Sequence, residues 1–480
     1  MFKSRLSVAC LFFVTTVAIG APHGILPGDM NPKGEACRDF FDYANGNWRA
    51  QNAIPDYMDR WSRRWQSGEV NKEHVRDILV GLSARSDWPK GSAEQLVGDY
   101  YAACMDEAAI DAAGLKPAQP MLDAVRAIHD RAGIAHEIYA LAALGTAAPV
   151  AVYSTQDLHD PNLVVAQIDA GGLGLPDRDY YLKTEPRFVE ARAKYLEHVQ
   201  RMFELAGLAP AAAKAKAARI FAFEKRLAES MLDNVALRDP VQQDHKMSFA
   251  DLQNLTPSFD WGGYFAANGL PRDDVNVTQP AFLKRFDEQI SDAPVARWRD
   301  YLEWIVLNNA ADRLSKPFVE QNFAFYNKYL SGATTMKPRQ IRCAQGADGQ
   351  IGEALGKAYV DKYFPPEAKA RMQDMVKNIL LAMDDTIRGL EWMSEATKAK
   401  AQEKLASFAP KIGYPDKWKQ YRGMSISRAS YWDNATAAQR WSVADNRGEI
   451  GKPVDRSKWG MTPPTSNANY NPSLNEIVFP

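Results

Sequence analysis

The chain has 480 residues, which is enough for more than one hydrophobic core, and its 46% hydrophobic and 24% charged residues are ordinary globular values. The formal net charge is −1, so electrostatics give no reason to expect nucleic acid or an anionic membrane surface as a partner.

Residues 1–20 have the pattern of a secretory signal peptide. Lys3 and Arg5 precede an apolar run from Leu6 to Ile19, and a small residue, Gly20, follows it. The run is short for a membrane span, which needs about 20 apolar residues. We therefore expect cleavage after Gly20, export to the periplasm or the extracellular space, and no stable membrane span afterwards. An anchor made by the uncleaved segment is the alternative.

A tether and an aromatic-rich stretch follow the signal peptide. Residues 21–36 are rich in proline and glycine and predict a flexible tether. Residues 37–48 read CRDFFDYANGNW and predict the start of a helix that ends near Asn45-Gly46. Taken alone, these aromatic residues indicate core packing.

From Val70 to Leu144 the apolar spacing of three and four residues predicts helices. Within this region His136-Glu137-Ile138-Tyr139-Ala140 begins like a zinc-binding helix, but Ala140 stands where the second histidine is needed. His129 lies seven residues before His136, and two turns are a poor spacing for one ion. We interpret His136 as an ordinary helix residue and expect this chain to bind no metal.

Two short strands are predicted at residues 149–153 and 163–168, on either side of a polar turn. The string GGLGLPDRDYY follows at residues 171–181. Glycine-rich loops can bind phosphate, but the lysine and the strand–loop–helix context of such sites are missing here. We expect a tight loop that leads into a helix.

The chain is predicted to stay mainly helical up to Trp418. The expected helices lie at residues 188–205, 211–231, 302–314, 318–330 and 351–364. A longer helix should begin at Pro365-Pro366, because proline is tolerated in a first helical turn. One face of that helix carries an apolar stripe of Met372, Met375, Val376, Ile379, Met383, Ile387 and Leu390. Such stripes are usually core, so we expect this face to be buried.

The last segment, residues 459–480, contains the turn signals Pro463-Pro464 and Asn471-Pro472 and ends in Ile477-Val478-Phe479. This β-prone run has no later residues to supply a neighbour. We therefore expect an unpaired strand, which would be an aggregation liability.

Several of these strings resemble the neprilysin family of zinc metalloendopeptidases, which includes neprilysin and endothelin-converting enzyme. They are CRDFFDYANGNW (37–48), GLGLPDRDYY (172–181), EWMSEATKAKAQEKL (391–405), KIGYPDKW (411–418) and the final segment with Asn467-Ala468, Tyr470-Asn471-Pro472 and NEIVFP (475–480). The motifs occur in the family's order and cover about Cys37 to Pro480.

The resemblance implies a mainly α fold. A large helical N-terminal domain with a few short strands would occupy residues 37–418 and close over a cavity that admits peptides. Residues 419–480 would form a linker and the first edge strand of a thermolysin-like α+β catalytic domain. In the family an HExxH zinc helix lies beyond this point, and this sequence contains no HExxH.

We therefore expect a truncated chain, inactive by itself, with no catalytic residue and no metal ligand of its own. Zinc would belong to the full-length enzyme, and the partners would be peptide substrates and the missing catalytic half. A non-catalytic secreted module that binds peptides or other partners is the alternative. Such a module should end near Trp418, so we favour the first interpretation.

The resemblance also assigns site residues. Asn467 and Ala468 match an edge strand that holds an extended peptide by main-chain hydrogen bonds, and Arg60 matches an arginine that reaches the C-terminal side of that peptide. The residues after it, Ser62 to Trp65, depart from the family pattern.

The four cysteines fit the same resemblance. Cys10 lies in the signal peptide, and export makes disulfides possible. The resemblance implies a disulfide between Cys104 and Cys343. Cys37 matches a cysteine whose partner lies near the C-terminus of full-length enzymes, so we expect Cys37 to be unpaired.

Overall fold

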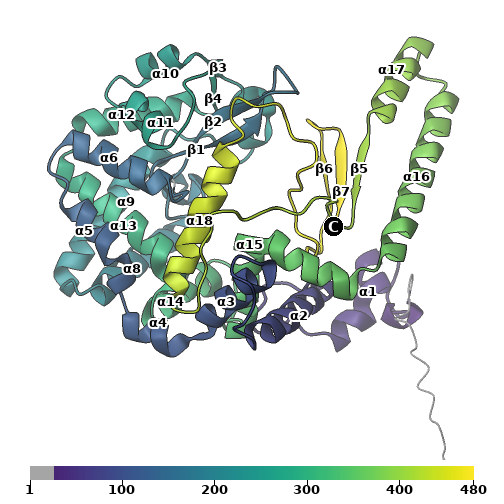
Figure 1. The fold of residues 1–480 in the computed structure, drawn as a ribbon, viewed down its shortest axis with the longest axis horizontal. Coiled ribbons are helices and arrows are strands. Elements are labelled where there is room, and N and C mark those ends of the chain that lie inside the picture. Colours follow the sequence, from purple (N-terminus) through teal and green to yellow (C-terminus); the bar gives the residue numbers. More distant parts are fainter. Residues whose placement is uncertain (1–25, 147) are drawn as a thin grey trace, which may run out of the picture.

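The computed structural model describes residues 26–146 and 148–480, and the predicted signal peptide and the first part of the predicted tether lie outside these residues. The described chain is mainly helical, with two small sheets (Figure 1). The α-helices are α1 (Phe40–Gln51), α2 (Arg63–Ser83), α3 (Ala93–Met105), α4 (Glu107–Ala113), α5 (Gln119–Arg126), α6 (Arg131–Ala142), α7 (Asp179–Leu182), α8 (Pro186–Leu205), α9 (Pro210–Ala228), α10 (Phe249–Leu255), α11 (Trp261–Ala267), α12 (Pro280–Asp292), α13 (Val295–Ala310), α14 (Lys316–Asn322), α15 (Arg339–Tyr363), α16 (Pro366–Gly389), α17 (Glu395–Ala406) and α18 (Tyr431–Arg447). The strands are β1 (Val150–Gln156), β2 (Val164–Ala170), β3 (Lys246–Met247), β4 (Val275–Val277), β5 (Ala409–Ile412), β6 (Asn469–Asn471) and β7 (Glu476–Phe479).

The predicted mainly α fold is confirmed, and so are the two predicted strands after the first helices. Side-chain caps explain where many of the helices begin. Ser62 accepts a hydrogen bond from the Trp65 backbone N–H at the start of α2, and Ser92 does the same for Gln95 at the start of α3. No helix in the described part of the chain is long and apolar enough to cross a membrane.

The first sheet has the order β1-β2-β4-β3 and packs within an aromatic core. β1 and β2 are antiparallel, with Val150 opposite Ala170, and β4 runs parallel to β2. The core beside them contains the fully buried Trp261 and Trp298 from α11 and α13. This half of the molecule lies on the side of Figure 1 away from β5, β6 and β7.

A second core surrounds one buried carboxyl group. Glu224 on α9 accepts hydrogen bonds from the Tyr195 hydroxyl at 2.8 Å and the Tyr181 hydroxyl at 2.9 Å. The Leu175 N–H in turn donates to the Tyr181 oxygen at 3.0 Å, and a Cβ at Gly174 would overlap the Tyr195 hydroxyl. The glycine-rich string is therefore a tight loop that leads into α7, as predicted, and Glu224 holds it in place.

A third core joins α2, α3 and α15. A disulfide links Cys104 on α3 to Cys343 on α15, two residues 239 positions apart, and this is the pair that the resemblance implied. Leu79 on α2 and Leu355 on α15 are both fully buried in the same core. Cys37 is exposed and, among the described residues, has no disulfide partner.

The second sheet corrects the prediction for the end of the chain. β7 pairs with β5 in parallel, with Ile412 opposite Phe479, and with β6 in antiparallel, with Asn471 opposite Glu476. The prediction of an unpaired strand is therefore wrong, because both neighbours of β7, β5 and β6, come from earlier in the chain. β5 lies before residue 418, so this sheet takes strands from both sides of the predicted domain boundary, which stays a prediction.

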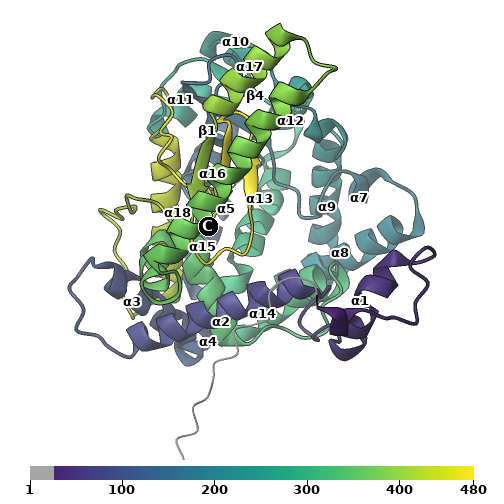
Figure 2. The ribbon, with the colours of Figure 1, turned by 90° about the vertical axis from the view of Figure 1, so that its right-hand side faces the viewer.

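The predicted burial of the α16 stripe is also wrong for most of its residues. Only Val376 and Ile387 are buried, whereas Met375, Ile379 and Met383 are 47%, 56% and 48% exposed. Figure 1 shows α16 and α17 side by side at one edge of the molecule, and Figure 2 shows α16 from that side. The stripe has helical spacing, but within residues 26–146 and 148–480 no element covers Met375, Ile379 and Met383.

We expect Ile379→Gln to change the free energy of unfolding by less than about 0.5 kcal/mol, because the side chain already contacts water. Leu355→Ala, at a fully buried position of α15, should cost about 2–5 kcal/mol. Urea unfolding of both variants measures the difference. A cost above about 2 kcal/mol for Ile379→Gln would mean that the stripe is covered in solution.

Glu224 should make stability depend on pH. Burial raises the pKa of Glu224 from 4.5 to about 8, against the lowering effect of the Tyr195 and Tyr181 hydroxyls. Between pH 4.5 and pH 8 the Glu224 carboxyl group is ionised in the unfolded chain but protonated in the folded chain. The contribution of Glu224 to stability is therefore fully present below pH 4.5 and is lost as the pH rises toward 8.

Glutamine cannot ionise, so Glu224→Gln should match the parent at pH 4.5 and exceed its stability by roughly 2–4 kcal/mol at pH 8. Urea unfolding of parent and variant at both pH values tests this, because the comparison cancels the groups that the two proteins share. An unchanged stability difference between the two pH values would contradict it.

Candidate functional site

The open edge of the second sheet is formed by β6. This strand pairs with β7 on one side, and no described strand pairs with its other side. Asn467 and Ala468 come directly before β6, and both residues are exposed. Free N–H and C=O groups at such an edge can bind another extended chain.

Polar contacts fix the segment before β6 between α2 and α15. The Arg64 Nη2 donates to the Asn467 Oδ1 at 2.8 Å, across 403 residues of sequence. The Asn71 Nδ2 donates to the Pro464 carbonyl at 3.2 Å. On the α15 side the Thr462 hydroxyl donates to the Asp348 Oδ1 at 2.9 Å. The edge is thus held in a defined position by two helices from distant parts of the chain.

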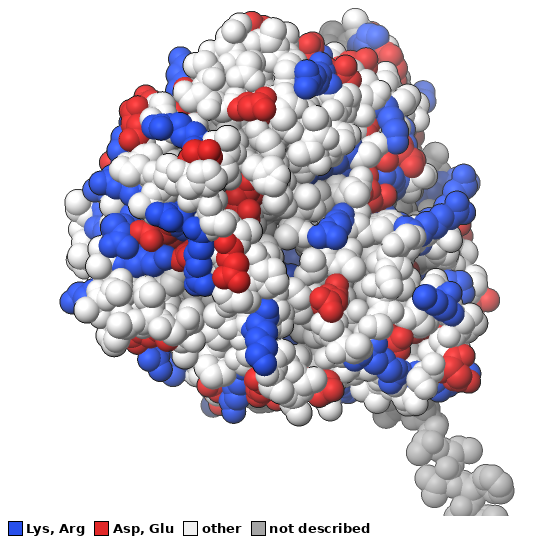
Figure 3. Space-filling view, turned by 60° about the vertical axis from the view of Figure 1, so that its left-hand side comes forward, with Lys and Arg blue, Asp and Glu red and all other residues white. Residues whose placement is uncertain are grey.

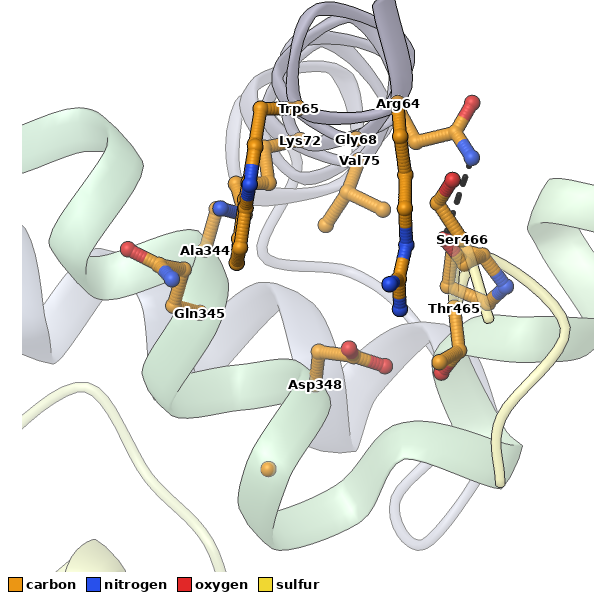
Figure 4. Close-up of a pocket in the computed structure, with 13 residues that line it drawn as sticks. Arg64, Trp65, Gly68, Lys72, Val75, Ala344, Gln345, Asp348, Thr465 and Ser466 are labelled. Atoms are coloured by element: carbon orange, nitrogen blue, oxygen red, sulfur yellow. Dashed lines mark hydrogen bonds between the residues drawn. The ribbon is translucent and has the colours of Figure 1, made fainter. Parts of the chain in front are cut away.

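A cavity of about 280 Å³ lies next to this edge, between α2 and α15. Figure 4 shows Trp65 and Arg64 extending from α2 on opposite sides of the cavity, with Asp348 on α15 facing them. Thr465 and Ser466, the two residues before Asn467, also line it. The complete lining is Arg64, Trp65, Gly68, Asn71, Lys72, Val75, Ala344, Gln345, Asp348, Gly349, Pro464, Thr465 and Ser466.

The charges around the cavity are partly neutralised. Glu69, which is nearly buried, lies 2.6 Å from the Lys72 Nζ and 3.0 Å from the Lys337 Nζ. Burial alone would raise the pKa of Glu69, but these two ammonium groups hold it below its ordinary value. Burial raises the pKa of Asp348, and the Thr462 hydroxyl opposes that rise. Arg64 and Asp348 are therefore the lining charges without an opposite charge in hydrogen-bond contact.

Arg60 lies at the rim of the site and does not contact Asn467. Its guanidinium pairs with Asp59 at 2.6 Å, and its side chain is 63% exposed. It also lies over the Trp65 ring, 5.6 Å from the ring centre. The structure brings Arg60 close to the cavity wall, and its role toward a peptide stays a prediction.

Sequence reasoning missed Arg64, the residue that contacts Asn467 directly. The available signal was the departure from the family pattern at Ser62 to Trp65. That departure indicated an altered site but could not show which side chain reaches a segment 403 residues away.

The histidines near the predicted zinc-like string do not form a metal site. His136 is exposed, and Glu137 next to it is buried, which raises the pKa of its carboxyl group. His129 is 86% exposed and lies 3.5 Å from Asp130. Across residues 26–146 and 148–480, no three His, Cys, Asp or Glu side chains converge in a way that could hold a metal ion. Among these residues, His129 and His136 therefore have no further donor groups with which to bind a catalytic zinc ion.

The surface charge is mixed. Basic and acidic side chains alternate over the face drawn in Figure 3, which agrees with the net charge of −1. That face carries no large patch of positive or negative charge.

Comparison with known proteins places these features in one family. Residues 36–415 match the model of peptidase family M13. Endothelin-converting enzyme 1 of Rattus norvegicus is 28% identical over 500 aligned residues, which cover 100% of this chain and 64% of that enzyme. The chain therefore spans less than two thirds of this relative's length.

Solved structures agree with the fold. A crystal structure of the Mycobacterium tuberculosis zinc metalloprotease Zmp1 with an inhibitor has a TM-score of 0.90 and 31% identity, covering 96% of this chain and 70% of that one. PepO from Lactobacillus rhamnosis has a TM-score of 0.83 at 23% identity, covering 93% and 71%, which shows the shared fold alone. The chain belongs to peptidase family M13, the family of neprilysin and endothelin-converting enzyme.

Proposed function

We propose that this chain is the N-terminal, peptide-binding portion of an exported zinc metalloendopeptidase that hydrolyses peptides in an enclosed cavity. The observation that carries the proposal is the open β6 edge at Asn467-Ala468, held by Arg64 beside a cavity of about 280 Å³. Family membership supports peptides as the substrate class.

An extended peptide would add to the sheet along β6 by main-chain hydrogen bonds. The Asn467 Oδ1 already accepts from Arg64, and its Nδ2 has no partner among the described residues. That amide group is therefore available to donate to a peptide carbonyl. Arg60, exposed at the rim, could pair with a carboxylate at the C-terminal side of the peptide.

Peptide hydrolysis by such an enzyme would need zinc ligands and a general base that the described residues do not supply. A catalytic zinc ion polarises the scissile carbonyl and lowers the pKa of a bound water, and a glutamate accepts the proton. The sequence contains no HExxH, and the donor groups of the described residues do not converge. We propose that the zinc ligands and the general base lie in sequence outside this chain, and that Lys3, Arg5 and the following apolar run direct its export.

A second candidate is a secreted module that binds peptides or partners without catalysis. The missing HExxH favours it, and the same β6 edge would serve as its binding surface. The two candidates agree on peptide binding by this chain and differ in whether a catalytic portion acts with it.

Peptide binding can be measured by fluorescence anisotropy with a labelled, alanine-rich hexapeptide. Asn467→Ala should weaken binding at least about 3- to 10-fold, because it removes the amide donor to the peptide, one neutral hydrogen bond, together with the Arg64 contact that positions the edge. Asn254→Ala is the matched control, because it removes an exposed asparagine amide on α10, far from β6 (Figure 1), and should leave the affinity unchanged. N-methylation of alternate peptide nitrogens should abolish binding. Parent protein that binds no peptide would overturn the proposal.

The zinc content of this chain tests the proposal that the zinc ligands and the general base lie outside it. After incubation with zinc and gel filtration, the 480-residue chain should carry substoichiometric zinc by mass spectrometry of the metal and hydrolyse no peptide. Stoichiometric zinc together with chelator-sensitive hydrolysis would show that the chain holds its own catalytic site.

A further inference from the structure

A second cavity lies away from the β6 edge, between β1 and the C-terminal part of α18. Its volume is about 300 Å³, at the lower end of the range for small-molecule sites, and it shares no lining residue with the cavity beside β6. Figure 1 shows one end of α18 next to β1. At Gly145 the backbone has a φ of +69°, and an added Cβ would overlap Gln439 and Val443 of α18. The chain before β1 is therefore held close against this helix at one side of the cavity.

Arg447, the last residue of α18, lines this cavity and is only 7% exposed. Its guanidinium donates to three neutral acceptors, the Val152 carbonyl at 3.0 Å, the Asn268 Oδ1 at 2.6 Å and the Tyr264 hydroxyl at 3.3 Å. These bonds fix the guanidinium against β1 and the end of α11. Because a guanidinium has five N–H groups, two of them have no acceptor among the described residues.

The charge of Arg447 has no counter-ion in the described part of the chain. Asp445, two residues before it, pairs with Lys419 at 3.2 Å. Glu449, two residues after it, pairs with Lys458 at 2.9 Å. No acidic side chain of the described residues lines the cavity. Burying an arginine without a counter-ion costs free energy, because the charge loses hydration and gains no ionic partner. A bound anion would supply that partner.

The other walls of the cavity decide which anion fits. They are neutral, with aliphatic surface from Ala151 and Val443 and a hydroxyl from Ser442. One cationic group matches a monoanion, whereas a doubly charged phosphate would keep one charge unpaired beside apolar walls. The two oxygens of a carboxylate also match the two N–H groups that Arg447 still offers. The cavity therefore favours a carboxylate that carries a small aliphatic or neutral polar group.

We propose that the cavity between β1 and α18 binds a carboxylate ligand, with Arg447 as its ionic partner. The carboxylate belongs to a peptide C-terminus or to a small aliphatic acid, since both present the same group to the guanidinium. Peptide hydrolysis creates a new C-terminal carboxylate, so peptide products are included. Binding here is independent of the proposed peptide binding at β6, because the two cavities have different walls.

Ligand-observed NMR titration of the 480-residue chain tests the site, because this method measures weak affinities. The probes are acetyl-dialanine with a free carboxylate, its C-terminal amide, and pentanoate. The free acid should bind at least about 10-fold more tightly than the amide, as expected for a charge-assisted pair. Both results with pentanoate support the site: equal affinity assigns it to small acids in general, and weaker binding assigns it to peptide C-termini. Equal affinity for acid and amide, or no binding of either acid, would overturn the proposal.

Ser442→Glu places a carboxylate in the cavity wall, at an exposed position of α18 where glutamate is a good helix former. This carboxylate competes with the ligand for Arg447 and should weaken acetyl-dialanine binding at least about 5-fold. Ser442→Gln is the matched control, because glutamine has the same size without the charge, and it should change the affinity less than about 2-fold.

Arg447→Gln removes the positive charge and should abolish the preference for the acid over the amide. Urea unfolding shows whether this variant is folded, and Ser442→Glu carries the test if it is not. Acetyl-dialanine binding that is unchanged in Ser442→Glu would overturn the proposal. Binding that is lost in Asn467→Ala instead would place the carboxylate at the β6 edge, so the α18 assignment would be wrong while peptide binding at β6 stands.

Discussion

The packing of α2 against α15 is the constraint on which the site depends. The two helices lie more than 250 residues apart in sequence, and α3, which packs against both, is joined to α15 by the Cys104–Cys343 disulfide. Closing so long a loop costs conformational entropy, and the covalent link removes part of that cost from folding. Once the helices are fixed, Arg64 and Asn71 from α2 and Asp348 from α15 hold the segment before β6 between them. The cavity and the strand edge are therefore consequences of one helical core.

This arrangement joins two kinds of recognition. The β6 edge offers main-chain groups, which bind any extended peptide with little regard for its sequence. The adjacent cavity offers side-chain contacts, which depend on the sequence of the peptide. Arg64 connects the two, because its guanidinium both holds the Asn467 Oδ1 and forms one side of the cavity. A change at Arg64 would consequently affect the position of the edge and the shape of the cavity together.

The local pattern of apolar residues predicted most helices and strands. The predictions that failed depended on contacts between residues that are far apart in the sequence. Apolar spacing located most helices, and the alternating runs located β1 and β2. The same spacing in α16 predicted burial, yet Ile379 is 56% exposed, because periodicity shows that a face exists but not what covers it. β7 was expected to be unpaired, but it pairs with β5, whose residues lie 67 positions before their partners, as Ala409 does before Glu476. Arg64 could not be recognised for the same reason, since its partner Asn467 is distant in sequence.

The carboxyl groups of Glu224 and Asp348 differ in their hydrogen-bond partners, and this difference separates a structural residue from a residue of the candidate site. Glu224 is enclosed by tyrosine hydroxyls that satisfy its oxygens, so its carboxyl group is a structural link for the glycine-rich loop. Asp348 is satisfied on one oxygen only, at the wall of a cavity open to a ligand. Asp348 is only partly buried, so water in the cavity can reach this second oxygen and hydrogen-bond to it. Glu224 therefore contributes to the fold, whereas Asp348 keeps an oxygen that remains accessible in the cavity beside β6.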